Sequence, residues 1–218
     1  MDTERARIKE MIRLLRNHYV RGRTSLEFSN PLEILVATIL AAQATDKWVN
    51  MITPALFKRY PTAAHFARAN RAELEKEIRS TGFFRNKTKS IIGAAKTIVS
   101  DFGGRVPDTM EALVTLPGVA RKTANIVLSS GFGKAEGIAV DTHARRLSQR
   151  LGLSKEKDPV KIERDLMAVI PKRDWLDFNY LLVEHGRAVC QARKPRCPEC
   201  FLNGLCPSAN VFYPDLDI

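Results

Sequence analysis

The sequence contains no hydrophobic run that approaches the roughly 18 residues of a membrane span. It also has no acidic tract, and its 35 Lys and Arg outnumber its 24 Asp and Glu to give a net charge of +11. The first five residues, Met-Asp-Thr-Glu-Arg, lack the apolar core of a signal peptide. These absences predict a soluble, cytoplasmic protein that is not bound to a membrane.

The basic excess has two possible explanations. A polyanion, and nucleic acid first of all, is the usual partner of a basic surface. A basic surface can also serve solubility alone. The charge favours nucleic acid without deciding between the two.

Cysteine is scarce, and all four residues fall near the end of the sequence, at Cys190, Cys197, Cys200 and Cys206. In a reducing compartment such a cluster favours metal ligation over disulfides. The spacing C-x6-C-x2-C-x5-C supplies four thiolates, which suit either tetrahedral zinc or a [4Fe–4S] cluster. The four residues by themselves leave both open.

No stretch alternates between polar and apolar residues for more than a few positions, so strands are not expected. Helices are marked instead by apolar periodicity, by Asn30-Pro31, Asn70 and Asn86 as possible starts, and by glycines as stops. Pro54 is expected to interrupt or divide its helix. The sequence predicts an all-α fold with helices at about 3–20, 32–42, 62–69, 71–80, 86–102, 109–116, 120–131, 142–150, 159–171 and 174–190. The helix that contains Pro54 is expected to be capped by Thr45 or Asp46.

The central stretch is 116–128, in which Pro117-Gly118 forms a turn between two short helices. The first amides of the second helix lack partners and lie at the positive end of its dipole, so they favour an anion. Lys122 lies in that first turn. A neutral Lys122 amine could attack an electrophilic carbon and form an imine.

Asp141 is the second candidate catalyst, because a carboxylate can stabilise positive charge on a sugar ring or move a proton. The loop 132–140 is long enough to bring it back alongside Lys122. The helix start disfavours the ammonium form of Lys122, whereas a nearby carboxylate favours it. For an isolated lysine and aspartate, a surface lysine and a helix cap would be the preferred interpretation.

Residues 116–128, Leu-Pro-Gly-Val-Ala-Arg-Lys-Thr-Ala-Asn-Ile-Val-Leu, resemble the helix-hairpin-helix of the endonuclease III family of DNA glycosylases. Val140-Asp141-Thr142-His143 is similar to that family's aspartate motif. The resemblance implies that Lys122 attacks C1′ of the damaged nucleotide and then supports strand cleavage by β-elimination. It gives Asp141 a part in both steps, whereas His143 is expected only to hold the aspartate loop.

The cysteine spacing resembles the iron–sulfur site of the same family at every interval, which implies a [4Fe–4S] cluster rather than zinc. The loop between the first two ligands carries Arg193, Lys194 and Arg196, which are expected to grip phosphates.

The resemblance covers about 30–206 and marks further DNA-binding residues. In the hairpin these are Gly118, Ala120 and Arg121, with Ala120 in place of the family's second glycine. Its N–H can face a phosphate only if its φ is negative. Gln43 is expected to fill the gap left by a flipped nucleotide. Phe83, in preference to Phe84, is expected to act as an apolar wedge.

The resemblance implies two helical domains that flank a DNA groove. Residues 24–134 form a six-helix barrel with the hairpin, and residues 1–23 and 135–218 form the iron–sulfur domain. The implied function is removal of oxidised pyrimidines of the thymine glycol type from duplex DNA, followed by cleavage of the abasic site through a Lys122 Schiff base. The protein is expected to be a monomer. If the source is a prokaryote, it is expected to be associated with the nucleoid. Two rivals are a mismatch glycosylase, whose members typically lack the lysine, and a non-catalytic DNA-binding protein with a zinc site.

Overall fold

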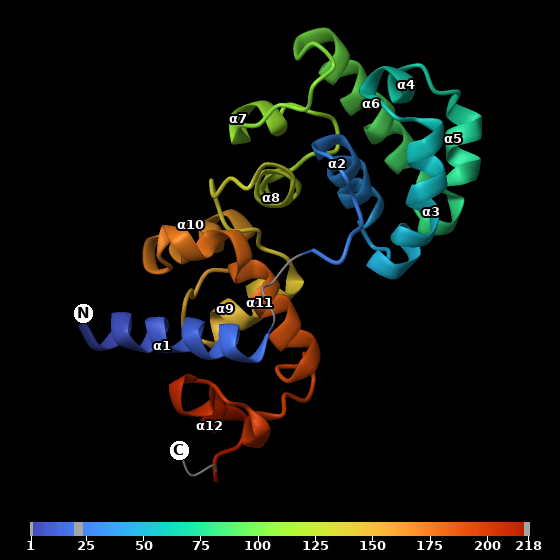
Figure 1. The fold of residues 1–218 in the computed structure, drawn as a ribbon. Coiled ribbons are helices and arrows are strands. Elements are labelled where there is room, and N and C mark those ends of the chain that lie inside the picture. The colour runs from blue at the N-terminus through green and yellow to red at the C-terminus, as the bar shows by residue number, and fades with distance from the viewer. Residues whose placement is uncertain (1, 20–23, 216–218) are drawn as a thin grey trace. The chain divides into compact units, whose positions relative to one another are not determined.

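A computed structural model describes residues 2–19 and 24–215 (Figure 1). Every regular element in these ranges is helical and none is a strand, which confirms the all-α prediction. No helix in the same ranges is long and apolar enough to cross a membrane. The chain divides into two compact units, Thr24–Glu136, here called the hairpin unit, and Met1–Arg23 with Gly137–Ile218, here called the cysteine unit.

The hairpin unit consists of helices connected by short turns. Its elements in order are α2 (Pro31–Leu40), α3 (Asp46–Arg59), α4 (Ala63–Ala67), α5 (Arg71–Glu77), the 3-10 turn η1 (Arg79–Thr81), α6 (Phe84–Asp101), α7 (Met110–Leu113), α8 (Arg121–Ile126) and the π-helical turn η2 (Val127–Gly131).

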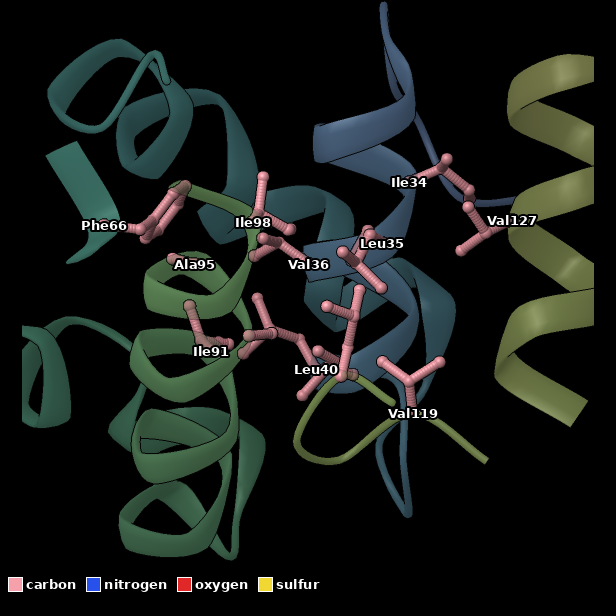
Figure 2. Packing of buried hydrophobic residues seen from close by; sticks show 14 of the residues in the cluster. Ile34, Leu35, Val36, Leu40, Phe66, Ile91, Ala95, Ile98, Val119 and Val127 are labelled. Carbon is pink, nitrogen blue, oxygen red and sulfur yellow. The ribbon is translucent and has the colours of Figure 1, made fainter. Parts of the chain in front are cut away.

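Helix α2 lies at the centre of this unit and contacts α3, α6, α8 and η2. Figure 2 shows Ile34 pointing toward Val127 of η2, and Leu40 near Ile91 of α6. A ten-residue helix is marginal by itself in water, so α2 depends on this packing. Its buried side chains contribute roughly 10 kcal/mol at about 1.5–3 kcal/mol for each large one; they are Ile34, Leu35, Val36, Ala37, Ile39 and Leu40.

The beginning of α2 follows from its sequence. The Asn30 side chain accepts hydrogen bonds from the N–H groups of Leu32 and Glu33, and Pro31 occupies the first helical position. Asn70 caps α5 in the same way, and Thr45 caps α3. These three predicted helix starts are confirmed.

The expectation that Pro54 breaks its helix is wrong. Helix α3 runs without interruption from Asp46 to Arg59 and contains Pro54. Proline removes one backbone hydrogen bond and crowds the preceding turn. The helix persists because Val49, Thr53 and Leu56 are buried, so tertiary packing offsets the lost bond.

The prediction that Asn86 caps the sixth helix is also wrong. Helix α6 begins at Phe84, and Phe83 occupies the cap position with a left-handed φ of 48° and no side-chain cap. The carbonyl of Phe83 accepts the N–H groups of Asn86 and Lys87 at 3.0 and 3.1 Å. Gly82, with φ 68°, and Phe83 together make a sharp turn that starts the helix two residues early.

The cysteine unit combines α1 with the second part of the chain. Residues Ile8, Met11, Ile12 and Leu15 of α1 are buried in its core, and α1 contacts α11. Arg16 of α1 pairs with Asp174 at 2.6 Å and with Asp177 at 2.8 Å. The elements of this unit are α1 (Asp2–His18), α9 (Thr142–Arg150), α10 (Pro159–Val169), η3 (Lys172–Asp174), α11 (Trp175–Ala188), η4 (Cys197–Glu199), η5 (Asn203–Leu205) and α12 (Ala209–Phe212).

Candidate functional site

The predicted hairpin consists of α7, a tight turn and α8. Thr109 caps α7, and the N–H of Val119 donates to the carbonyl of Leu116 at 3.0 Å to close the turn. Leu116 and Val119 are buried, whereas Gly118 and Ala120 are exposed. The turn therefore presents backbone to solvent while its apolar side chains anchor it in the core.

Gly118 is required at its position for two reasons. Its φ is 80°, a left-handed conformation that a residue with a Cβ adopts at a cost of about 1–2 kcal/mol. A Cβ there would also lie only 2.5 Å from Cβ and Oγ of Ser90 on α6. The turn is thus packed closely against α6.

Ala120 is the residue where the hairpin departs from the family pattern. It is the N-cap residue of α8 with φ −92°, so the alanine is unstrained and meets the condition set for its N–H to face a phosphate. Helix α8 continues from Ile126 into the π turn η2, so the second hairpin helix is α-helical over a shorter range than 120–131.

Lys122 lies at the second position of α8, in its first turn, and is exposed. Its neighbour Arg121 is half-buried and has a partner within the protein. The next residues, Ala124 and Asn125, are buried and fix the helix against the unit. Lys122 is therefore a solvent-accessible amine on a rigid support at the helix start.

Asp141 is the N-cap of α9, and its Oδ1 accepts the N–H of Ala144 at 2.7 Å. The preceding segment is fixed because Ile138, Ala139 and Val140 are buried and the Asn179 amide donates to the carbonyl of Ala139 at 2.7 Å. One carboxylate oxygen thus has a structural role, and the half-buried side chain is held in place from both sides.

His143 lies in the first turn of α9, two residues after Asp141. Its Nδ1 accepts from Arg146 Nη2 at 3.2 Å, and burial lowers its pKa against the opposing charge of Asp141. A Cβ on Gly186 of α11 would lie 2.7 Å from that Nδ1, so the imidazole is packed directly on the α11 backbone.

Lys122 belongs to the hairpin unit and Asp141 to the cysteine unit. That the loop 132–140 brings the two side chains together stays a prediction.

Gln43 and Phe83 share an unusual backbone. They are the non-glycine residues with positive φ in the described part of the chain, at 57° and 48°. Gln43 is exposed and Phe83 is 62% exposed, whereas Phe84 is half-buried against the core. Strained, exposed positions of this kind are characteristic of functional loops. Phe83 rather than Phe84 offers an accessible ring.

The four cysteines line a common cavity in the cysteine unit, and none of them forms a disulfide. Burial, helped by the neighbouring thiols, raises the pKa values of Cys197 and Cys206, and burial raises that of Cys200 to about 11. Such thiols become thiolates only when a metal replaces their protons. In the described residues no three His, Cys, Asp or Glu side chains are arranged to hold a metal ion as they stand. What the four thiols share is the cavity, and their chemistry fits an iron–sulfur cluster.

His185 also lines this cavity and was missed in the sequence. Its Nε2 lies 3.5 Å from Cys200 Sγ, and its Nδ1 lies 3.0 Å from the Tyr19 hydroxyl. Burial, with a smaller effect of His18, lowers the pKa of His185 to about 4, so the imidazole is neutral near pH 7.

The loop after Cys190 is held mainly by α9. Arg150 donates to Cys190 Sγ at 3.3 Å and to the carbonyls of Gln191 and Ala192, both at 2.8 Å. Arg146 donates to the carbonyl of Cys190 at 3.0 Å. Helix α9, which Asp141 caps, therefore also orders the first cysteine.

The three predicted phosphate contacts in this loop are not equivalent. Arg196 pairs with Glu199 at 3.0 Å and donates to the carbonyl of Ala188, so it anchors the loop. Arg193 and Lys194 are exposed and make no ion pair within the described residues. They are the two cations of this loop that are available to a ligand.

Comparison with known proteins shows which family has these sequence features. The family model for the HhH-GPD superfamily base excision DNA repair protein matches residues 36–172, which is more than half of the chain. The model for the iron-sulfur binding domain of endonuclease III matches residues 190–206, the interval from the first cysteine to the last. Endonuclease III of Synechocystis is 56% identical over 97% of this chain and 96% of its own length. The chain belongs to the endonuclease III family.

Two solved structures extend the similarity to the fold. A trapped covalent intermediate of endonuclease III with DNA is 36% identical, with a TM-score of 0.89 over 95% of this chain and 97% of the other. A thermostable thymine-DNA glycosylase is 26% identical, with a TM-score of 0.85 over 96% and 98%.

The family membership confirms the predicted function class. The chain is a DNA glycosylase and AP lyase of base excision repair, it binds DNA, and its cofactor is a [4Fe–4S] cluster. The rival hypothesis of a non-catalytic DNA-binding protein with a zinc site is therefore wrong.

A buried lysine, Lys87, was also missed in the sequence. It lies on the buried face of α6 with Ile91, Ala94 and Ile98. This spacing of three and four residues was the available signal, because a lysine in an apolar stripe must find partners inside the protein.

The hairpin geometry predicts that one small substitution lowers stability and that a second one, two residues away, has little effect. Gly118→Ala places a Cβ in a left-handed residue and against Ser90, so we expect the melting temperature to fall by several degrees, consistent with at least about 1 kcal/mol. Ala120→Gly is its control, because φ −92° suits both residues, and we expect a change within about 0.5 kcal/mol. Thermal unfolding followed by circular dichroism checks both. Equal melting temperatures for the two variants would contradict this account.

The cysteine cavity predicts that the purified protein is brown and carries about four iron atoms per chain. Cys200→Ser should lower both the iron content and the broad visible absorption, since it removes one of the four predicted ligands. Ser208→Ala changes a residue near Cys206 that is not a predicted ligand, so it should leave the iron content and the absorption unchanged. Iron analysis and absorption spectra measure this, and a colourless zinc protein would rule it out.

Proposed function

We propose that this glycosylase removes oxidised pyrimidines from duplex DNA and that Lys122 is the residue that reacts with the sugar. The observation that carries the proposal is the placement of Lys122, an exposed amine in the first turn of α8 behind a solvent-facing hairpin turn. A relative in the same family forms a covalent intermediate with DNA. A protein that does so needs a nucleophile of this kind.

The proposed reaction begins with extrusion of the damaged nucleotide, which breaks its stacking and pairing. The neutral Lys122 amine attacks C1′, the glycosidic bond breaks, and the base leaves with a proton. Ring opening gives an imine between Lys122 and C1′. Removal of a C2′ proton then expels the 3′ phosphate by β-elimination, and hydrolysis of the imine returns the lysine.

Asp141 is proposed to stabilise the cationic sugar and to assist proton transfer. One of its oxygens is already bound to the N–H of Ala144, which fixes the carboxylate orientation. The role requires Asp141 to approach Lys122 across the two units, as the loop length allows.

The phosphate contacts are proposed to come from backbone as well as side chains. The amides of Gly118 and Ala120 at the start of α8 suit an anion, and Arg121 adds charge beside them. Arg193 and Lys194 of the cysteine loop form the second set of contacts, with Arg196 holding the loop. The cluster orders this loop, and it takes no part in bond breaking.

Gln43 is proposed to fill the gap left by the extruded nucleotide, and Phe83 to separate the neighbouring bases. Both side chains are exposed on left-handed residues of the hairpin unit. We further propose that residues 24–134 and residues 1–23 with 135–218 act as two domains that flank the DNA groove, and that the protein is a monomer.

A mismatch glycosylase is the rival within this class, because a thymine-DNA glycosylase has a similar structure. The sequence resemblance implies that such relatives typically lack the reactive lysine. The presence of Lys122 therefore favours a bifunctional enzyme that acts on damaged pyrimidines.

Borohydride trapping tests the chemistry. The parent protein should form a covalent adduct with duplex DNA that contains an abasic site, because borohydride reduces the imine to a stable amine. Lys122→Gln should form none and should lose strand cleavage by at least about a hundredfold, the loss typical of a removed catalytic group. Lys96→Gln, an exposed lysine of α6, is the control and should form the adduct normally. An adduct with Lys122→Gln would assign the chemistry to another amine.

A panel of duplexes tests the substrate class. Thymine glycol should be excised and the strand cleaved without alkali, and a plain abasic site should also be cleaved. Uracil and thymine opposite guanine should remain intact under the same conditions. Excision of mismatched thymine with strand cleavage only after alkali would favour the rival.

A further inference from the structure

Gln43 and Phe83 lie on two turns that are far apart in sequence but are joined inside the hairpin unit. Gln43 follows the end of α2 at Leu40. Phe83 follows the end of η1 at Thr81. The residue that joins the two ends is Lys87 of α6.

Lys87 is only 5% exposed, and its ammonium group reaches both ends at once. Its Nζ donates to the carbonyl of Leu40 at 2.7 Å and to that of Thr81 at 2.8 Å. Its backbone N–H donates to the carbonyl of Phe83 at 3.1 Å. Within the described residues no carboxylate pairs with it, and burial lowers its pKa.

The carbonyl of Leu40 needs this donor. The N–H of Ala44 would continue the helix by bonding to Leu40, but it donates to Ala41 at 3.2 Å instead. The end of a helix leaves such carbonyls without partners and carries a partial negative charge. A lysine that donates to two such carbonyls satisfies them and receives compensation for its own buried charge.

A second hydrogen bond connects the same regions. Trp48, near the start of α3 just after the Gln43 turn, donates from Nε1 to the carbonyl of Ser80 at 2.9 Å. This side chain is 44% exposed, so the buried Lys87 is the stronger restraint of the two.

We propose that Lys87 is a positioning residue that fixes the Gln43 turn and the Phe83 turn relative to each other. The two side chains then enter the duplex as one rigid unit, in one step of nucleotide extrusion. This inference rests on the proposed roles of Gln43 and Phe83 in DNA. Lys87 itself touches neither DNA nor the reacting sugar.

The test compares two substrates that differ in whether they need extrusion. Lys87→Met keeps the length of the side chain but removes its donors. We expect its kcat/KM on a thymine glycol duplex to fall about tenfold, which corresponds to about 1.4 kcal/mol. Borohydride trapping on a single-stranded abasic oligonucleotide, where no base pair must open, should stay within about twofold of the parent.

Lys96→Met is the matched control, because it makes the same change on the same helix at an exposed lysine without a hydrogen bond to either turn. It should behave like the parent on both substrates. A duplex with 2-aminopurine opposite an abasic analogue supplies a spectroscopic signature. Its fluorescence should rise with the parent and with Lys96→Met, and much less with Lys87→Met.

Hydrogen exchange measures the coupling between the Gln43 turn and the Phe83 turn independently of activity. In the parent, the amides of 41–44 and 81–84 should open together with one common protection. In Lys87→Met they should exchange faster while the rest of the hairpin unit is unchanged. If Lys87→Met does not fold, hydrogen exchange in the parent still shows whether the two turns open together. Lys87→Arg retains donors for both carbonyls, so it should keep most of the activity on the duplex.

Three results would overturn the inference. Equal losses on both substrates would make Lys87 a purely structural residue, and unchanged duplex activity in a folded Lys87→Met would remove its role. Separate opening of the two turns in the parent would show that nothing joins them. Failure of the parent itself to act on the lesion duplex, with common opening retained, would instead refute the proposed function.

Discussion

The packing of α2 is the interaction on which the hairpin unit depends. Its apolar side chains meet α3, α6, α8 and η2, so the helix has almost no solvent-facing surface to vary. The hairpin is held on one side of this helix, and the Gln43 turn lies at its end. Gly131 of η2 approaches so closely that a Cβ would lie 3.1 Å from Ile34, which shows how little space separates the elements. Gln43 and Phe83 can be held at positive φ because the core beneath them is densely packed.

Three long cationic side chains donate to carbonyls at the ends of helices or in loops. Lys87 does this for α2 and η1, Arg150 for the loop after Cys190, and Arg7 for the carbonyls of Leu151 and Leu205. A part of the positive charge is thus structural. The net charge of the chain overstates what is available to DNA, as Arg196 in its ion pair with Glu199 also shows.

The sequence predicted what local chemistry determines. Asn30-Pro31 and Asn70 specify helix starts through their own side chains, and the hairpin and cysteine spacing identified the family. It failed at Pro54 and Asn86, where packing and a left-handed turn override local preference. The sequence could not reveal that Phe83 and Gln43 adopt positive φ, because neither is a glycine. Nor could it pair Lys87 with Leu40, since that contact joins residues 47 positions apart.

The cysteine unit is built from both ends of the chain, and this has a consequence for synthesis on the ribosome. Helix α1 emerges first, but the helices that cover its apolar face emerge only after residue 140. The intervening 24–136 segment has its own core and can fold before the helices that pack against α1 have been synthesised. The four cysteines follow this segment in the chain, so the hairpin unit is synthesised before the residues that are predicted to bind iron. Newly made protein therefore passes through a stage in which a basic amphipathic helix has been synthesised and the helices that cover it have not.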